Sequence, residues 1–564
     1  MKKLTFSLFI LPIFLMVFYT NQSYSQVYPY TVWDKTYNAP SNLQDSSVSI
    51  SMNSLGMVFV TGWSLGTTTS SDIATIRYNP ANGDTIWVKR FIGSLEDRVT
   101  SMTSDNNAVY ITGWTFNAPP VTNRDVITIK FNAVTGDTMW VKKYNGPRGG
   151  GDYGLAITND ANFIYVCGRA SDSGAVERQR YLILKYDINT GAMAPGFPYI
   201  YRGDTTNNEA HAIKVDNSGN IYITGQTSFN FQLPPYPCNV LTLKVNSAGT
   251  LVWAKTHNAS GNKADNGVAI GFDNTQSNLF IAGWGEKSSY NDFIIIRYNP
   301  VTGDSTGYVS YNGPTNGTDY LVRMVMDAGN NIYITGNSQN NTLNRYEIAT
   351  LKYNSSLVQQ WVKRTTNADG WDVVNWITLG SNNDVYIEGS RVKAGEGYNF
   401  YTVRYDASTG EPIWTKMENA GGSTTHDFGS GIIIGDSQRV FITGSSVFVP
   451  SSTASIHTLR YSNELVGIKP ISTEVPNSFN LQQNYPNPFN PATSIRFDIP
   501  KASAVNLVVY DAAGSIVEVI ADNVNLPAGK YETTWDAGKY ASGIYFYRIQ
   551  AGSYTDTKKM IMVK

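Results

Sequence analysis

Short hydrophobic runs that end in glycine recur along most of the chain. Two of them, Asn220–Gly225 and Asn331–Gly336, share the sequence NIYITG, and their β-branched and aromatic residues predict strands. Successive glycines lie 51, 55, 57, 58, 53, 53 and 55 residues apart, at Gly62, Gly113, Gly168, Gly225, Gly283, Gly336, Gly389 and Gly444. This spacing indicates a repeated unit of four short strands, because it is too long for a leucine-rich or ankyrin repeat.

Three further strands are predicted in each unit. One lies upstream of the glycine-ending strand and begins at an acidic residue that is followed by alternating apolar positions. The next strand downstream ends in a basic and an aromatic residue, as in Arg77-Tyr78, with Lys244-Val245 as the single departure. A tight turn with glycine then leads to a strand with tryptophan, as at Trp87. Each unit is therefore predicted to be a four-stranded meander.

Eight such sheets predict an all-β fold. A four-stranded sheet cannot bury both of its faces alone, so the sheets are expected to stack face to face around an axis. Residues 27–468 are therefore predicted to form an eight-bladed β-propeller. The segment Thr31–Pro40 aligns with Thr138–Pro147, whereas the eighth unit ends without its tryptophan strand. We expect the N-terminal strand to complete the last blade and close the ring.

The repeated motifs also resemble a known family. The D-x-x-x-x-I, NIYITG and TIKYN-type motifs are similar to the SBBP class of bacterial β-propeller repeats, over about three quarters of the chain. The resemblance implies a propeller. Members of this class share no single activity, so the resemblance supplies no function.

The repeat stops near residue 468. Residues 469–483 are rich in Ser, Thr, Pro and Asn and are predicted to form a mobile linker. After the proline-rich segment Asn484–Pro500, alternating stretches such as Val505–Val509 and Tyr531–Trp535 predict short strands. Residues 484–564 are therefore predicted to form a small β-sandwich.

This tail resembles a domain of bacterial secretion. QNYPNPFNP, VVYDAAGSIV, LPAGKY, ASGIYFYRI and the final KKMIMVK are similar to the type A C-terminal sorting domain of the type IX secretion system, which is related to the FlgD Ig-like module. The resemblance implies an Ig-like domain that is read by the type IX secretion machinery. After export, the protein would be released or attached to surface polysaccharide. The alternative is an ordinary accessory Ig-like domain.

The N-terminus predicts export. A basic start, an apolar run at Leu4–Tyr19 and small residues at Ser23–Ser25 indicate a signal peptide at residues 1–25. The alternative, a transmembrane anchor, is disfavoured because the run is shorter than the roughly 20 residues that span hydrocarbon. The mature protein is expected to be a monomer without a transmembrane anchor, secreted into the medium or held on the outer cell surface.

Composition narrows the classes of function. With 43 Lys and Arg against 44 Asp and Glu, the net charge is −1, which leaves no basic footprint for nucleic acid. Cys167 and Cys238 allow at most one disulfide, so stability must come from buried area. The four histidines lack metal-ligand spacing, and no metal or cofactor is predicted.

No nucleophile-base set, paired-carboxylate motif or phosphate loop is recognisable, so no catalytic residue is predicted. The acidic residues that begin the upstream strands, which we call the acidic ring, are Asp45, Asp97, Asp152, Glu209, Asp265, Asp319, Asp372 and Asp427. They could bind a ligand or cation, but we favour a structural role in which each carboxylate binds backbone amides or a neighbouring hydroxyl. Turns such as Asp216–Asn220 and Asp327–Asn331 resemble calcium loops, but they lack the terminal glutamate and are predicted to be hairpin turns.

Trp63, Trp114 and Trp284 follow the motif glycine in only three units. Packing between blades is the favoured interpretation, and a platform for sugar stacking is the alternative. The sequence thus predicts a non-enzymatic scaffold for binding or adhesion, with surface polysaccharide or another glycan as its partner.

Two enzymatic alternatives remain. One is a secreted polysaccharide hydrolase or lyase with carboxylates at the mouth of the propeller channel. The other rests on Asp406–Trp414, which resembles the tryptophan docking motif of eight-bladed quinoprotein dehydrogenases. The adjacent-cysteine disulfide of their alcohol-dehydrogenase branch is absent.

Overall fold

A computed structural model describes most of the chain. The described residues are 29–40, 43–66, 70–93, 95–117, 123–147, 149–171, 178–203, 207–228, 238–259, 264–286, 290–422, 425–435, 439–449, 451, 453–462, 468–472, 474–526, 528–538 and 540–564. The predicted signal peptide at 1–25 lies outside them. Two compact units divide at residue 469: Val27–Lys469 and Pro470–Lys564.

The prediction of an all-β fold is confirmed. The described residues of the larger unit form eight four-stranded sheets. Their first strands are β2 (Asp45–Met52), β6 (Asp97–Ser104), β10 (Tyr153–Asn159), β14 (Asn207–Val215), β18 (Asp265–Phe272), β22 (Asp319–Met326), β26 (Asp372–Leu379) and β30 (Thr425–Ile434). The second strands are β3 (Val58–Ser64), β7 (Ala108–Phe116), β11 (Phe163–Ser171), β15 (Ile221–Ser228), β19 (Leu279–Glu286), β23 (Ile332–Asn340), β27 (Val385–Lys393) and β31 (Val440–Phe448).

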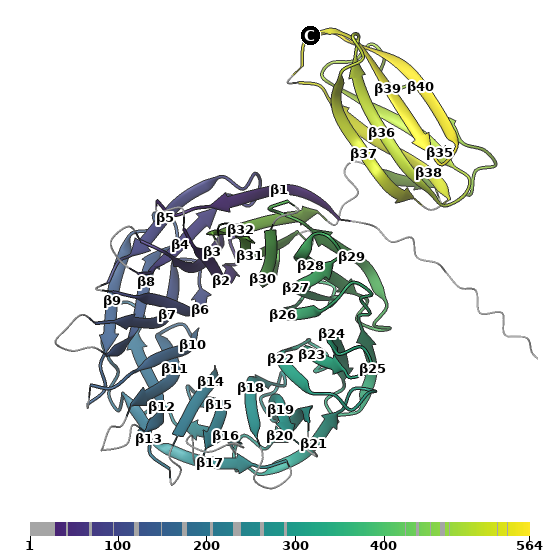
Figure 1. Cartoon of the computed structure of the whole chain (residues 1–564). Helices are drawn as coiled ribbons and strands as arrows, with labels where there is room; N and C mark the ends of the chain where they lie inside the picture. Colours follow the sequence, from purple (N-terminus) through teal and green to yellow (C-terminus); the bar gives the residue numbers. More distant parts are fainter. Residues whose placement is uncertain are drawn as a thin grey trace, which may run out of the picture. The chain divides into compact units, whose positions relative to one another are not determined.

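The remaining strands complete each meander. The third strands are β4 (Asp72–Tyr78), β8 (Arg124–Asn132), β12 (Gln179–Asp187), β16 (Cys238–Val245), β20 (Asn291–Tyr298), β24 (Arg345–Tyr353), β28 (Gly397–Tyr405) and β32 (Thr453–Ser462). The fourth strands are β5 (Thr85–Phe91), β9 (Thr138–Tyr144), β13 (Tyr199–Tyr201), β17 (Leu251–His257), β21 (Ser305–Tyr311), β25 (Gln359–Arg364), β29 (Pro412–Glu418) and β1 (Tyr30–Tyr37). In Figure 1 the first strands lie around a common centre and the fourth strands lie outermost.

The N-terminal strand belongs to the last sheet, whose order is β1-β32-β31-β30. It runs antiparallel to β32, with Lys35 opposite Thr458. The first and last sheets also touch at their inner strands, where Ser47 Oγ lies 2.6 Å from Ser430 Oγ and the Ser47 amide donates to Ser445 Oγ at 3.1 Å. Backbone pairing and side-chain contacts therefore join the two ends of the repeat.

Neighbouring sheets are linked by a repeated clamp. A fourth-strand tryptophan Nε1 and a third-strand lysine Nζ donate to the same carbonyl in a turn of the following sheet, and the aliphatic lysine stem can lie along the sheet. The groups are Trp140 and Lys130 on Ile188 O, Trp253 and Lys244 on Pro300 O, and Trp361 and Lys352 on Ala407 O. The turns need glycine at the contact: Gly136 has a φ of 73°, and a Cβ there would lie 2.6 Å from Trp87 Cδ2.

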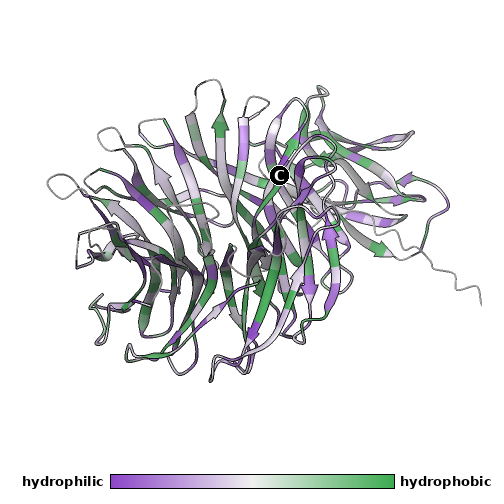
Figure 2. Ribbon diagram, turned by 60° about the horizontal axis from the view of Figure 1, so that its bottom comes forward, coloured by the Kyte–Doolittle hydropathy of each residue, from purple (hydrophilic) through white to green (hydrophobic). Residues whose placement is uncertain are grey.

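The smaller unit contains two four-stranded sheets, β33-β38-β35-β34 and β37-β36-β39-β40. Their strands are β33 (Lys469–Ser472), β34 (Asn480–Leu481), β35 (Ala492–Ile499), β36 (Ser503–Asp511), β37 (Ile516–Leu526), β38 (Gly529–Asp536), β39 (Gly543–Ala551) and β40 (Tyr554–Met562). Trp535 of β38 packs edge to face on Tyr545 of β39, with ring centroids 5.3 Å apart. Figure 2 shows hydrophobic stretches within the strands of both units.

The predicted linker at 469–483 is wrong at both ends. Lys469–Ser472 forms the edge strand β33, and Asn480–Leu481 forms β34 with Leu481 buried. Phe479 stacks on Tyr554 at 5.2 Å. An edge strand pairs on one side only and tolerates polar residues on the other, which is why composition alone suggested a linker. Within the described part of the chain, no helix is long and apolar enough to cross a membrane.

Candidate ligand-binding face

The acidic ring lies at the beginning of the first strands. All seven of its aspartates are fully buried, and Glu209 is partly buried. Several carboxylates accept a backbone N–H from the connection that leads in from the preceding sheet. The distances are 2.8 Å from Ala39 to Asp45, 2.7 Å from Ala259 to Asp265 and 2.7 Å from Gly313 to Asp319. These bonds tie each connection to the sheet that follows it.

Burial also changes the acidity of the ring. It raises the pKa of Asp45, Asp152, Asp265 and Asp319 to about 6, and backbone hydrogen bonds to the ionised form offset this only in part. Four of these carboxyl groups therefore begin to take up protons close to neutral pH.

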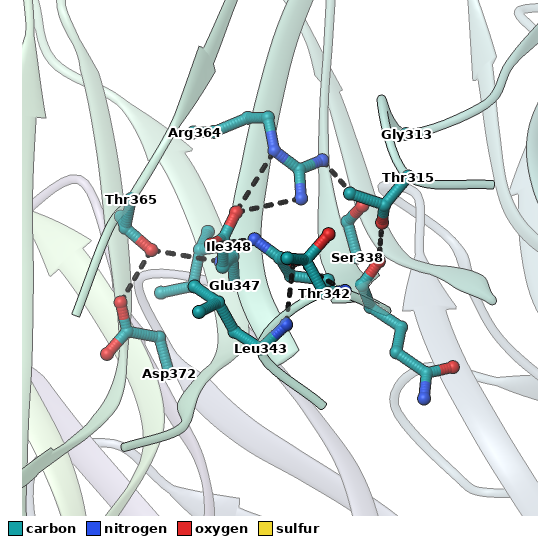
Figure 3. A network of polar contacts seen from close by, with 12 residues as sticks. Gly313, Thr315, Ser338, Thr342, Leu343, Glu347, Ile348, Arg364, Thr365 and Asp372 are labelled. Atoms are coloured by element: carbon teal, nitrogen blue, oxygen red, sulfur yellow. Dashed lines mark hydrogen bonds and ion pairs between the residues drawn. The ribbon is translucent and has the colours of Figure 1, made fainter. Parts of the chain in front are cut away.

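Two ring members have charged partners. Asp372 accepts from Arg391 Nε at 2.9 Å and Nη2 at 2.6 Å, and from Thr365 Oγ1 at 2.6 Å. Figure 3 shows how Thr365 also accepts from the Ile348 amide of the preceding sheet. Glu209 is bound by Arg169 at 2.9 Å. Donors of the protein thus engage these carboxylates.

Arginine occupies two of the three predicted tryptophan platforms. The Arg98 guanidinium lies 3.6 Å from the Trp63 ring centroid, and that of Arg124 lies 4.7 Å from the Trp114 centroid. Glu96 joins the two arginines, at 3.0 Å from Arg98 Nε and 3.8 Å from Arg124 Nη2. Trp63 and Trp114 therefore belong to a ladder of cation–π contacts and ion pairs, with one face of each ring occupied.

Other aromatic side chains are open to solvent at the same end of the unit. First and third strands begin at this end, and second and fourth strands end there. We define the aromatic face by five residues, Tyr290, Tyr320, Trp371, Phe428 and Phe448, which are 43%, 37%, 44%, 40% and 39% exposed. The third predicted platform residue, Trp284, packs its ring edge to face on Tyr320 at 5.3 Å, and Tyr346 does the same on Trp371 at 5.4 Å.

Sequence reasoning missed the aromatic face, although a local signal exists. Tyr320 and Phe428 directly follow a ring aspartate, and Trp371 directly precedes one. Successive side chains of a strand point to opposite sides, so a neighbour of a buried aspartate points away from it. An aromatic residue next to an acidic-ring position in the sequence is therefore a signal for a solvent-exposed aromatic side chain.

The opposite end of the unit contains turns that are closed by aspartate side chains. Asp216 Oδ1 accepts the amides of Ser218 and Asn220 at 2.9 and 2.8 Å, and Asp327 closes its turn in the same way. In the described ranges, no group of three or more His, Cys, Asp or Glu residues is placed to hold a metal ion. Cys167 and Cys238 are both free and buried.

Comparisons with known proteins identify the tail. Residues 483–564 match the family described as secretion system C-terminal sorting domain, which confirms the predicted sorting domain and supports export through the type IX secretion system. No curated protein matches the chain.

Several solved structures are similar to the chain in fold. A europium-containing methanol dehydrogenase is 11% identical, with a TM-score of 0.43 over 77% of this chain and 93% of its own. Sqt1 from Chaetomium thermophilum is 10% identical, with a TM-score of 0.46 over 76% and 99%. The β-propeller domain of the Trilobed protease from Pyrococcus furiosus is 8% identical, with a TM-score of 0.38 over 65% and 95%. The chain is an all-β protein whose larger unit contains eight four-stranded sheets within the described residues, with a sorting domain at its C-terminus.

Proposed function

We propose that the protein is a non-enzymatic glycan-binding or adhesion protein of the extracellular medium or the outer cell surface. Its larger unit is an eight-bladed propeller of SBBP-type repeats closed by β1, and its tail is an Ig-like sorting domain. The pairing of β1 with β32 and the contacts of Ser47 with the last sheet support the closed ring. The sorting-domain match supports the location.

The exposed rings of the aromatic face are the observation on which the binding function rests. Large aromatic side chains on a surface mark interaction sites, since they offer rigid apolar area at a small entropic cost. Here they come from several sheets, and the connections at 312–318 and 341–344 at the same end carry amide and hydroxyl groups, such as those of Asn316 and Asn341. Flat apolar faces beside neutral hydrogen-bonding groups suit sugar rings.

Affinity electrophoresis of the full-length protein tests this proposal. We expect gels that contain xylan, pectin or mannan to retard the wild-type protein with at least one polysaccharide. The double variant Trp371→Ala, Tyr320→Ala should lose most of this retardation. Tyr308→Ala is the matched control, because Tyr308 is 41% exposed but lies on the fourth strand β21.

Two outcomes would reject the proposal. One is a wild-type protein that no polysaccharide retards. The other is a double variant that is retarded as strongly as the control.

A further inference from the structure

Each first strand has one residue that lies opposite the second-strand residue preceding the motif glycine. In two neighbouring sheets the residue at this position departs from the repeat. Its occupants are, in sheet order, Ser49, Ser101, Ala156, Ala212, Ala269, Arg323, Trp376 and Gly431. Six are small, and the two large side chains come from adjacent sheets. Small residues at a position shared by all sheets reflect close packing, so a cation and an indole there need another explanation.

The two exceptional side chains are stacked. The Arg323 guanidinium carbon lies 4.2 Å from the centroid of the Trp376 ring. The Arg323 side chain is exposed although its strand, β22, is one of those at the common centre in Figure 1. No hydrogen bond or ion pair engages Arg323 among the residues described. Its N–H donors, which form a rigid fork, are thus free for a ligand.

The residue opposite Trp376 also breaks its series. Five sheets have threonine at this second-strand position, whereas β27 has Glu388. Its side chain is fully buried, and burial raises its pKa well above the ordinary value, which the nearby Gly431 amide offsets only in part. Because burial favours the protonated form of Glu388, this carboxyl group supplies less negative charge near Arg323 than an ordinary carboxylate would.

A second uncompensated cation lies on a first strand. Lys214 of β14 is exposed, and no described residue pairs with it. Burial lowers the pKa of Lys214 and of Arg323. Protein atoms therefore surround both charged groups, although each side chain retains exposed surface. Arg98, the remaining cation of the first strands, is paired with Glu96. Within the described residues, Arg323 and Lys214 are therefore the cations of the first strands that no acidic side chain pairs with.

We propose that Arg323, stacked on Trp376, binds the oxyanion of a small ligand, either a carboxylate or a phosphate, and that Lys214 adds to the attraction. Stacking holds the guanidinium plane in place, and its paired N–H groups match the two oxygens of such an anion. This site is separate from the aromatic face and does not depend on glycan binding there.

Isothermal titration of the full-length protein with inorganic phosphate and with glucuronate tests the site. The wild-type protein should bind at least one of them, and the responding probe identifies the oxyanion. Arg323→Gln should weaken binding by about tenfold or more, as expected for the loss of a charge-assisted pair. Lys143→Gln makes the same charge change on the fourth strand β9, where the side chain is exposed, and should leave binding unchanged.

A folding defect is controlled by a second variant. Arg323→Lys keeps the charge and the stem but loses the planar fork, so it should bind more weakly than the wild type while melting at a similar temperature. Wild-type affinity in Arg323→Gln or in Arg323→Lys would overturn the proposal. The failure of both probes to bind the wild-type protein would overturn it as well.

Discussion

Two buried carboxyl groups of neighbouring sheets follow different rules. Asp319 occupies a position that is acidic in all eight sheets, and it accepts from the Gly313 amide at 2.7 Å and from the Ser338 hydroxyl. Glu388 replaces a repeated threonine, and within the described residues the Gly431 amide lies close enough to lower its pKa but makes no hydrogen bond of ordinary geometry to either carboxyl oxygen. The acidic position thus repeats together with a backbone amide of the incoming connection in six of the sheets. Residues that break the repeat without a partner are the ones to examine for function.

The largest effect is expected for Asp319→Ala. The variant leaves the Gly313 amide and the Ser338 hydroxyl without their acceptor in a buried network. Arg364 donates to the same hydroxyl at 2.6 Å (Figure 3). We expect the free energy of unfolding to fall by about 2 kcal/mol in urea titrations.

The exposed Asp304 provides the control for this loss. Its side chain is 68% exposed and pairs with Lys255, so Asp304→Ala should change stability by less than about 0.5 kcal/mol. Equal effects of the two variants would show that the acidic ring does not hold the sheets together.

Glu388→Thr should have a smaller effect of the opposite sign. The variant restores the common residue and removes a buried acid that lacks partners, so we expect a gain of about 1 kcal/mol at pH 8. The space suits threonine, because Thr112 already packs on Gly154 as residue 388 would pack on Gly429. Glu388→Gln keeps the shape without the acid and serves as the control. A Glu388→Thr protein that melts below the wild type at every pH would contradict this interpretation.

The sequence alone predicts the positions that repeat in every sheet better than it predicts the residues that depart from the repeat. The period of the motif glycines was enough to predict the four-stranded sheets, and the match of Thr31–Pro40 to Thr138–Pro147 was enough to place β1 in the last sheet. The contact between Arg323 and Trp376 was not predictable, because every first strand has a β-bulge just before this position, as between Leu321 and Arg323 and between Val374 and Trp376. One inserted residue changes which side chains share a face, and sequence alone does not locate the bulge. The aromatic face was missed because three of its members, Tyr320, Trp371 and Phe428, lie beside the repeated acidic positions and not at them.

The smallest difference expected here is that between the wild-type protein and Glu388→Thr in how their stability depends on pH. It separates the two kinds of carboxyl group. The ring aspartates Asp45, Asp152, Asp265 and Asp319 have a pKa of about 6 in the folded protein against an ordinary 3.8. Between these values the folded state binds more protons than the unfolded state, so stability falls as the pH rises from about 4 to about 6. Carboxylates with a lowered pKa, such as Asp406, take up protons below this range and do not offset the fall.

Glu388 adds to this loss of stability. Its pKa is also raised well above the ordinary value, so the wild-type protein should lose more stability as the pH rises than Glu388→Thr does. Melting temperatures of both proteins from pH 4 to pH 9 measure the two profiles. Superimposable profiles would mean that Glu388 makes no contribution of its own to the pH dependence beyond that of the acidic-ring aspartates. A profile of Glu388→Thr that is flat from pH 4 to pH 6 would mean that the ring aspartates are not the source of the loss in that range, and the distinction between repeated and unrepeated carboxyl groups would fail.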